Sequence, residues 1–281
     1  MEVNIENKVD RKRLSIITDV IIFLILLNVF LLGFKFLVSN YSVSQNLSLE
    51  DIEISNKNYI ESSYIEDNYN IKILYGDEAF EPALKVDANI QEDEYIIYEN
   101  LLEIKGALRK YPQNFFEYNN LSIIILESFN NQNIALASRN KLNEFKIYLT
   151  NSINFERALH HEMYHVFEYK LNVNKNNIYN DWHKYNPDNF EYISNTKGLD
   201  DKYIYSKYTD KEDIYFVTKY SKTSEKEDRA EIFAEIMTFE TKPDFLVEDC
   251  NIRKKAEYIT TMMTVNLSDN NKRASFYWDR F

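Results

Sequence analysis

The sequence has very little cysteine, glycine or proline. Its single cysteine, Cys250, excludes a disulfide framework and a cysteine-based zinc finger, so any metal must be held by histidine, aspartate or glutamate. Four glycines and four prolines among 281 residues argue against a barrel of many tight turns and against collagenous or low-complexity character. We therefore expect helices and fairly long strands, in one domain of catalytic size.

Basic residues are scarce beyond the N-terminus. After residue 38 the chain carries 28 lysine and arginine residues against 41 aspartate and glutamate residues, a net charge of −13. A domain of that sign repels phosphate backbones, which argues against nucleic acid as a partner. Basic or neutral substrates are easier for such a domain to accept.

A long apolar run lies near the N-terminus, from about Ile16 to Val38. As a helix it is long enough to cross a hydrocarbon layer of ~30 Å. Because Arg11, Lys12 and Arg13 precede it, we expect residues 1–13 in the cytoplasm, an uncleaved transmembrane anchor over 14–38 and the rest outside the cell. A cleaved signal peptide and a secreted protein are the alternative, but the run exceeds the usual apolar core of about 7 to 15 residues.

The remainder divides into a polar stretch and a domain. Residues 39–68 are rich in Ser, Asn and Glu, which predicts a stalk. Residues 69–281 form the predicted domain, in which strands are expected at 69–76 and 121–126. The helical period of apolar residues predicts a helix within 92–112.

A third strand is expected at 144–149, where apolar and polar residues alternate as in an exposed edge strand. Helices should follow at 154–170, at about 225–240 and at about 252–265. The predicted fold class is therefore α+β, with a small mixed sheet, an edge strand, a helix directly after that strand and a helical C-terminal part.

The first of these late helices contains the motif H-E-x-x-H at His161, Glu162 and His165. Histidines four residues apart on a helix project to one face, so both imidazoles can hold one tetrahedral ion. The glutamate one step round the helix can reach a water on that ion, which is the geometry of a zinc hydrolase. The alternative is a helix whose surface happens to carry histidines. His160 points about 100° away from its neighbour and is expected to have no ligand role.

A catalytic zinc needs a third protein ligand. No histidine or aspartate with a glycine turn follows the motif closely, so we expect a glutamate on a later helix. Glu227 and Glu231 are four residues apart and share a helix face. Ser224 and Glu227 also fit a capping box, in which the glutamate folds back on the helix start, and Glu231 also fits an ordinary solvated carboxylate. Spacing alone does not choose between them.

Two stretches carry a family resemblance. "YSKTSEKEDRAEIFAE", from Tyr220, resembles the pattern Y-x-x-T-x-x-x-E-D-x-A-E-x-F-A of zinc-binding metallopeptidases among bacterial surface lipoproteins. "DWHKYNPDNFEY", from Asp181, is similar to the same family's W-x-x-x-N-P-x-x-F-x-Y signature. More distantly, the chain is similar to the catalytic domains of lethal-factor-like toxins and Pro-Pro endopeptidases. The motifs together span residues from about 155 to 240.

The resemblance implies a zincin-like domain of the gluzincin type, with His161, His165 and Glu227 as zinc ligands and Glu162 as general base. It places Tyr220 where it would steady the oxyanion, and Glu231 beside the site, orienting a ligand histidine. Arg229 departs from the pattern, since relatives usually carry a bulky apolar residue there.

The predicted function is that of a membrane-anchored zinc metallopeptidase outside the cytoplasm, with one catalytic Zn²⁺ and a peptide or protein substrate. An extended peptide would add to the edge strand at 144–149. Seven tyrosines in the stretch 182–220 would line a pocket or cover the core. Two alternatives are a catalytically silent surface module with a zincin fold, such as an adhesin, and a zinc amide hydrolase acting on the cell wall.

Overall fold

The computed structural model describes residues 48–112, 115–116, 120–131, 133–152, 154–174, 181–193, 215–240, 251–267 and 275–280. Residues 54–281 make up one compact unit. No helix in the described ranges is both long and apolar enough to cross a membrane. The anchor predicted at 14–38 lies outside those ranges.

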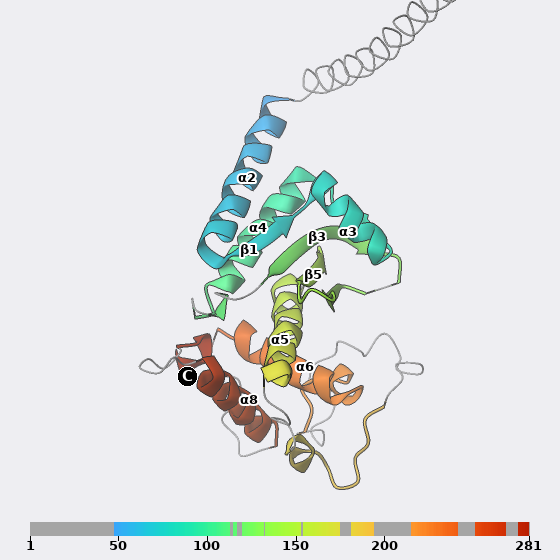
Figure 1. Ribbon diagram of the computed structural model, residues 1–281, viewed down its shortest axis with the longest axis vertical. Helices are drawn as coiled ribbons and strands as arrows, with labels where there is room; N and C mark the ends of the chain where they lie inside the picture. Colours follow the sequence, from blue (N-terminus) through green and yellow to red (C-terminus); the bar gives the residue numbers. More distant parts are fainter. Residues whose placement is uncertain are drawn as a thin grey trace, which may run out of the picture. The chain divides into compact units, whose positions relative to one another are not determined.

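A mixed sheet of five strands lies at the centre of the domain, as Figure 1 shows in part. Strand β3 (Leu121–Phe129) pairs in parallel with β1 (Ile71–Leu74) and β5 (Phe145–Thr150), and antiparallel with β2 (Ala88–Ile90). Strand β4 (Ala135–Arg139) pairs antiparallel with β5. The order β1-β3-β5-β4 confirms the small mixed sheet expected from the sequence.

Hydrophobic cores cover both faces of this sheet. On one face, side chains such as Ile123 pack against helices α4 (Glu94–Leu108) and α5 (Phe155–Asn174). On the other, side chains such as Ile124 pack against the short helix α3 (Phe80–Lys85). Neighbouring strand residues point to opposite faces, so the continuous apolar run of β3 supplies both cores.

The expected edge strand is in fact internal. Strand β5, predicted at 144–149 as an exposed edge, lies between β3 and β4. Its apparently polar face is buried, because Tyr148 and Thr150 are 2% and 6% exposed. The edge is β4, whose sequence "ALASR" lacks the large β-branched and aromatic residues that mark a strand.

The polar stretch predicted as a stalk differs from that expectation in its second half. Helix α2 covers Leu49–Tyr69, and its residues from Ile54 onward belong to the compact unit. The buried positions Ile54, Asn58, Ser62 and Ile65 recur every three or four residues, which is one helix face. Because two of these four are polar, hydropathy alone gave no helical signal.

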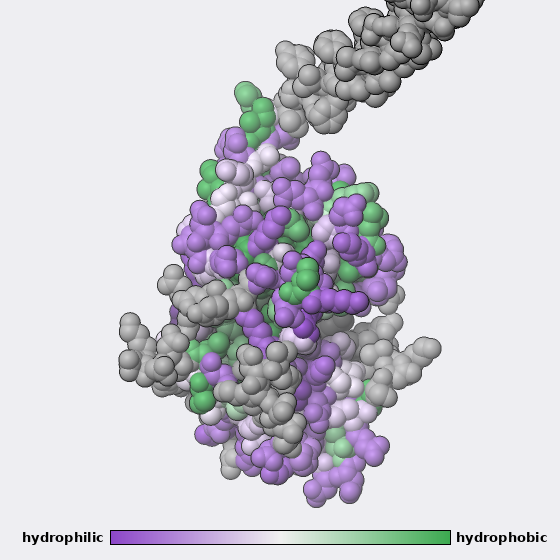
Figure 2. Space-filling view, in the orientation of Figure 1, coloured by the Kyte–Doolittle hydropathy of each residue, from purple (hydrophilic) through white to green (hydrophobic). Residues whose placement is uncertain are grey.

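Two further helices complete the described domain (Figure 1). Helix α6 (Glu225–Thr238) packs against α5 and against α8 (Asn251–Leu267), which confirms both predicted helices. Short 3₁₀ turns lie between these elements and at the C-terminal end, namely η1 (Gly76–Ala79), η3 (Trp182–Tyr185), η5 (Tyr220–Lys222) and η6 (Tyr277–Arg280). Figure 2 shows that hydrophilic side chains cover most of the visible described surface.

The aromatic insert is partly a core element. Trp182 is fully buried, and its indole N–H donates to Asp228 Oδ2 at 3.0 Å. The Tyr192 hydroxyl and the Lys255 ammonium donate to the same oxygen at 2.9 and 2.7 Å. These described aromatics therefore cover the core and tie the insert to α6 and α8. Residues 194–214 of the insert lie outside the described ranges.

Arg229, the departure from the family pattern, has a buried partner. Its Nε donates to Glu168 Oε1 of α5 at 2.5 Å, and both side chains are almost completely buried. Its Nη1 also lies 3.4 Å from Glu225 Oε2. A buried ion pair thus links α5 and α6 at this position.

Candidate metal centre

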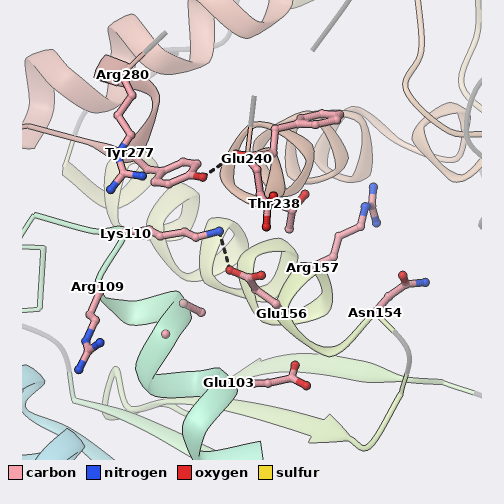
Figure 3. Close-up of a pocket in the computed structure, with 13 residues that line it drawn as sticks. Glu103, Arg109, Lys110, Asn154, Glu156, Arg157, Thr238, Glu240, Tyr277 and Arg280 are labelled. Atoms are coloured by element: carbon pink, nitrogen blue, oxygen red, sulfur yellow. Dashed lines mark hydrogen bonds and ion pairs between the residues drawn. The ribbon is translucent and has the colours of Figure 1, made fainter. Parts of the chain in front are cut away.

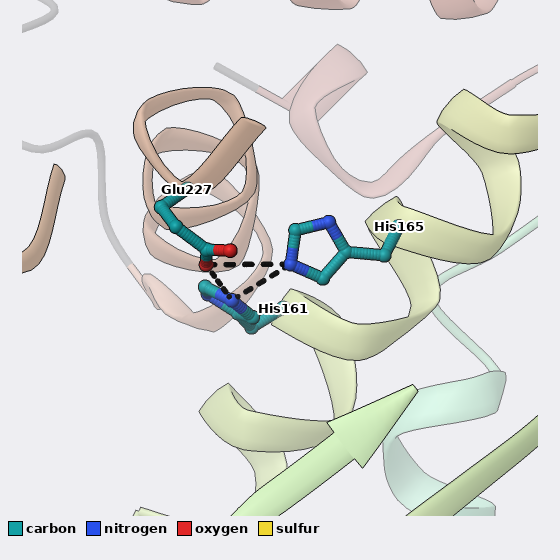
Figure 4. Close-up of side chains that lie close together, drawn as sticks. All are labelled: His161, His165 and Glu227. Atoms are coloured by element: carbon teal, nitrogen blue, oxygen red, sulfur yellow. Dashed lines mark hydrogen bonds and ion pairs between the residues drawn. The ribbon is translucent and has the colours of Figure 1, made fainter. Parts of the chain in front are cut away.

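The motif histidines lie on the buried face of α5, the helix that packs on both the sheet and α6. His161 is 7% exposed and His165 is partly buried. Their ring centroids are 4.8 Å apart with nearly perpendicular planes. The spacing of four residues thus brings both imidazoles to the side of α5 that faces Glu227 (Figure 4).

Three atoms of these side chains form a tight triangle. His161 Nε2 lies 2.9 Å from Glu227 Oε2, His165 Nε2 lies 3.1 Å from His161 Nε2, and His165 Nε2 lies 3.4 Å from Glu227 Oε2. Zinc bonds of about 2.0–2.1 Å in a tetrahedron put neighbouring ligand atoms roughly 3.3 Å apart. The three side chains therefore fit one zinc ion as they stand, with the fourth position left for water or substrate.

Glu227 belongs to this triangle although its helix is capped. Ser224 Oγ accepts a hydrogen bond from the Glu227 backbone N–H at 3.2 Å, which is half of a capping box. The Glu227 carboxylate does not close the other half, because it points toward the two imidazoles. The cap and the metal site thus use different groups of one residue.

Glu231 lies beside the triangle, and four groups donate to it. Its Oε1 accepts from His161 Nδ1 at 2.8 Å and from Arg157 Nη1 at 3.2 Å. Its Oε2 accepts from Arg157 Nη2 and from Thr218 Oγ1, both at 2.7 Å. Two bonds to each oxygen leave no lone pair of Glu231 for a metal, so Glu227 is the glutamate that could complete a ligand set, while Glu231 could orient His161.

The carboxylates hold a proton on His161 in the absence of metal. Burial lowers the pKa of this imidazole, but the hydrogen bonds to Glu227 and Glu231 and the negative charges of Glu231 and Glu162 raise it more, to about 10. In spite of burial, the two histidines hold the pKa of Glu227 well below its usual range, and Arg157 and His161 do the same for Glu231. A divalent cation would replace this proton.

Glu162 lies next to the triangle without joining it. Its side chain is 7% exposed, and burial raises the pKa of its carboxyl while the two histidines and a hydrogen bond from the Ala137 backbone lower it. Ala137 belongs to the edge strand β4. The carboxylate therefore lies between the metal centre and the edge strand, where it can take a proton from a water molecule.

Tyr220 faces the same centre from the turn η5. Its ring centroid lies 6.0 Å from that of His161, and the residue lines both cavities that contain Glu162. The turn directly precedes α6, so the tyrosine and Glu227 reach the site from one continuous segment. Sequence reasoning had placed all six residues at one site, and the structure brings them together.

Two cavities meet at the centre, with volumes of about 290 and 380 Å³. Both are lined by Asn133, Ala135, His161, Glu162 and Tyr220. The smaller extends toward the start of β4 and the larger toward its end. Together they form a groove along the edge strand, which is the shape that an extended peptide requires.

A larger cavity, about 870 Å³, lies elsewhere (Figure 3). It shares only Asn154 and Arg157 with the groove, among the described residues. Two of its cations are already engaged: Lys110 pairs with Glu156 at 2.6 Å, and Arg157 pairs with Glu231. The three side chains that could hold a metal ion line the cavity of about 380 Å³ and not this one.

His160 takes no part in the centre, as expected. It is fully buried, and its Nδ1 lies 2.7 Å from the Tyr111 hydroxyl. Its other ring nitrogen lies 3.4 Å from Glu156 Oε1. His160 is therefore a core residue, held by Tyr111, which follows α4, and by Glu156 of its own helix.

Sequence reasoning missed Arg157 and Thr218, which hold Glu231 in place. Arg157 precedes His161 by four residues, the spacing that also relates the two ligand histidines, so helix periodicity offered a signal. Thr218 offered none, because it is distant from the motif helix in sequence and lies before the turn that carries Tyr220. The contact depends on how that segment folds back onto α5.

No protein-family model matches the sequence, and no curated protein matches it significantly. Among solved structures, the chain is similar to a "putative zinc-binding metallo-peptidase" from Bacteroides caccae. The two are 16% identical, with 79% of this chain and 88% of that chain covered and a TM-score of 0.51. At this identity the likeness shows a shared fold: the domain has the mixed α+β architecture of that metallopeptidase-like structure.

Proposed function

We propose that this protein is a zinc-dependent peptidase. The observation that carries the proposal is the triangle of His161 Nε2, His165 Nε2 and Glu227 Oε2, whose edges of 2.9 to 3.4 Å suit a single zinc ion. The fold shared with the Bacteroides caccae protein supports it.

The chemistry divides among the residues of the groove. Zinc in such a site would lower the pKa of a water molecule and polarise a carbonyl oxygen. Glu162 would accept the proton of the water and pass it to the leaving amine. Tyr220 would donate a hydrogen bond to the developing oxyanion, and Glu231 would keep His161 in the tautomer that binds metal.

The substrate would bind along β4 rather than along β5. Strand β4 ends the sheet order among the described residues, and both cavities follow it. An extended peptide would pair with its free backbone groups, which gives affinity without sequence preference. The strand proposed to bind the peptide is therefore 135–139, and not 144–149 as the sequence had indicated.

Removal and restoration of the metal test this function. The purified chain should contain about one zinc per molecule and cleave members of a peptide library, lose cleavage after treatment with a chelator, and regain it when zinc is added. Stoichiometric zinc without peptide cleavage would favour a silent surface module, or an amidase if isolated cell wall is hydrolysed instead. A chain that binds no zinc would contradict both zinc enzymes and leave the silent surface module.

We propose further that residues 14–38 anchor the protein in the cell membrane, with residues 1–13 in the cytoplasm and the peptidase domain outside the cytoplasm. The support is the apolar run with its basic N-terminal flank. The full chain should resist extraction of membranes with alkaline carbonate, and external protease should digest the domain on intact cells. A soluble form that begins after residue 38 would favour cleavage and secretion.

A further inference from the structure

Two cationic side chains that have no part in the proposed metal chemistry lie at one end of the groove. Arg139 is the last residue of β4 and lines the cavity of about 380 Å³. Lys226, from the first turn of α6, lines the same cavity. Neither residue belongs to the metal cluster.

The guanidinium of Arg139 is held in place by its neighbours. It stacks on the ring of Tyr169, 3.7 Å from the centroid, and its Nε donates to Asn143 Oδ1 at 3.1 Å. Tyr169 in turn packs against Phe145. The Nη2 of Arg139 also donates to Asn143. The Nη1 of Arg139 has no protein partner among the described residues. A stacked arginine loses little further entropy when it binds a carboxylate.

The place of this arginine in the groove follows from two periodicities. Tyr169 follows His165 by four residues, so the aromatic support continues the helix face that carries the metal ligands. Arg139 follows Ala137 by two residues, so both side chains point to the same face of β4, about 7 Å apart along the strand. The backbone of Ala137 hydrogen-bonds to Glu162, which would act at the cleaved peptide bond. Arg139 would therefore face a substrate residue two or three positions from that bond.

Other charges nearby are already neutralised. Glu168 lines the same cavity, but Arg229 binds it at 2.5 Å. At the opposite end of the groove Arg157 is paired with Glu231 and Glu235. Away from the metal centre, Arg139 and Lys226 are the charged side chains of the described groove without an ion pair within 4.0 Å, although Lys226 also lies near enough to Glu168 to lower the pKa of that carboxyl.

We propose that this end of the groove is a subsite for an acidic side chain of the substrate, which Arg139 binds as the principal contact and Lys226 attracts. The inference rests on the proposed peptidase function and names its substrate class: peptides with Asp or Glu two or three residues from the cleaved bond. It reverses, for this position, the preference for basic or neutral substrates that the net charge alone predicts.

Cleavage of a position-scanned peptide library by the zinc-loaded chain tests the subsite. Replacing Glu by Gln at one position, two or three residues to one side of the cut, should lower kcat/KM by about tenfold or more, as for a charge-assisted hydrogen bond. Arg139→Gln should abolish the difference, and Arg139→Glu should favour Lys or Arg there. The control Lys141→Glu makes the same charge change in an exposed loop and should leave the preference intact. Equal cleavage of acidic and neutral peptides by the wild type overturns the proposal.

A binding experiment separates failure of the subsite from failure of the peptidase function. Zinc-loaded Glu162→Gln protein is used to select binders from a random decapeptide library. Enrichment of Asp and Glu that disappears with the added Arg139→Gln substitution supports the subsite even if no peptide is ever cleaved. A bound pool with the same acidic content as the input overturns it, whether or not the wild type is a peptidase.

Discussion

His161 Nε2 and His165 Nε2 lie 3.1 Å apart, with Glu227 Oε2 within hydrogen-bonding distance of the first. Two imidazole nitrogens at this separation suit a cation bound by both, or a proton on one of the two rings. In the metal-free protein that proton resides on His161, since the two glutamates raise the pKa of its imidazole to about 10. Zinc and this proton therefore compete for one site.

Zinc binding should release about one proton from His161 at neutral pH. The proton on His161 stabilises the metal-free fold because the pKa of this imidazole is higher in the folded than in the unfolded chain. This stabilisation is complete below the unfolded pKa of about 6.5 and is lost as the pH rises through about 10. The apparent zinc affinity should accordingly rise about tenfold per pH unit between pH 6 and 8. Calorimetry in buffers of different ionisation enthalpy measures the proton count, and a pH-independent affinity would contradict the assignment.

Glu227→Ala should remove the metal. The carboxylate would be the third ligand of the proposed site, and its loss would leave two histidines that cannot hold zinc in competition with a weak chelator. Zinc retention after dialysis is the measurement. Glu225→Ala, an exposed change two residues earlier in the same helix, serves as the control and should retain the metal. Retention by Glu227→Ala at wild-type affinity would instead point to Glu231 as a ligand.

Glu231→Gln should weaken zinc binding without abolishing it. The substitution keeps an acceptor for His161 Nδ1 but leaves Arg157 with Glu235 as its acidic partner. Loss of such an orienting contact costs about 10- to 100-fold in metal affinity. A competition titration with a chromogenic chelator gives the value, and a loss as complete as that of Glu227→Ala would be inconsistent with an indirect role.

Arg229→Leu should destabilise the fold although it restores the residue type expected in relatives. Breaking the buried pair leaves Glu168 uncompensated, at a cost of about 3–5 kcal/mol in the free energy of unfolding. The double variant Arg229→Leu with Glu168→Leu should recover most of this loss, because two apolar residues can pack there. Urea denaturation of the single and double variants measures both, and additive losses would argue against coupling.

Much of the site could be predicted because its signals are local. The two ligand histidines and Glu162 share one helix turn, and the capped helix with Glu227 carries its own pattern. What could not be predicted depends on tertiary packing. The strand alternation at β5 suggested an exposed edge, yet the Tyr148 ring fills the second face. The true edge, β4, is built from small residues whose strand conformation comes from pairing with β5.

The same reason explains the misjudged start of the domain and the missed neighbours of the centre. Asn58 is buried in α2 because its side-chain amide donates to Glu94, an interaction that hydropathy does not encode. Thr218 contacts Glu231 from a segment that precedes α6. Polar residues that satisfy one another across distant segments resemble solvated residues in a sequence.

Turnover of the zinc-loaded Glu162→Gln variant is the sharpest test of the proposed peptidase mechanism. Wild type and variant should bind one zinc each with similar affinity, while the variant cleaves peptides at least about a hundredfold more slowly, because only the proton acceptor is lost. Equal turnover by the two proteins, at equal zinc content, would contradict the role of Glu162 and with it the proposed peptidase mechanism.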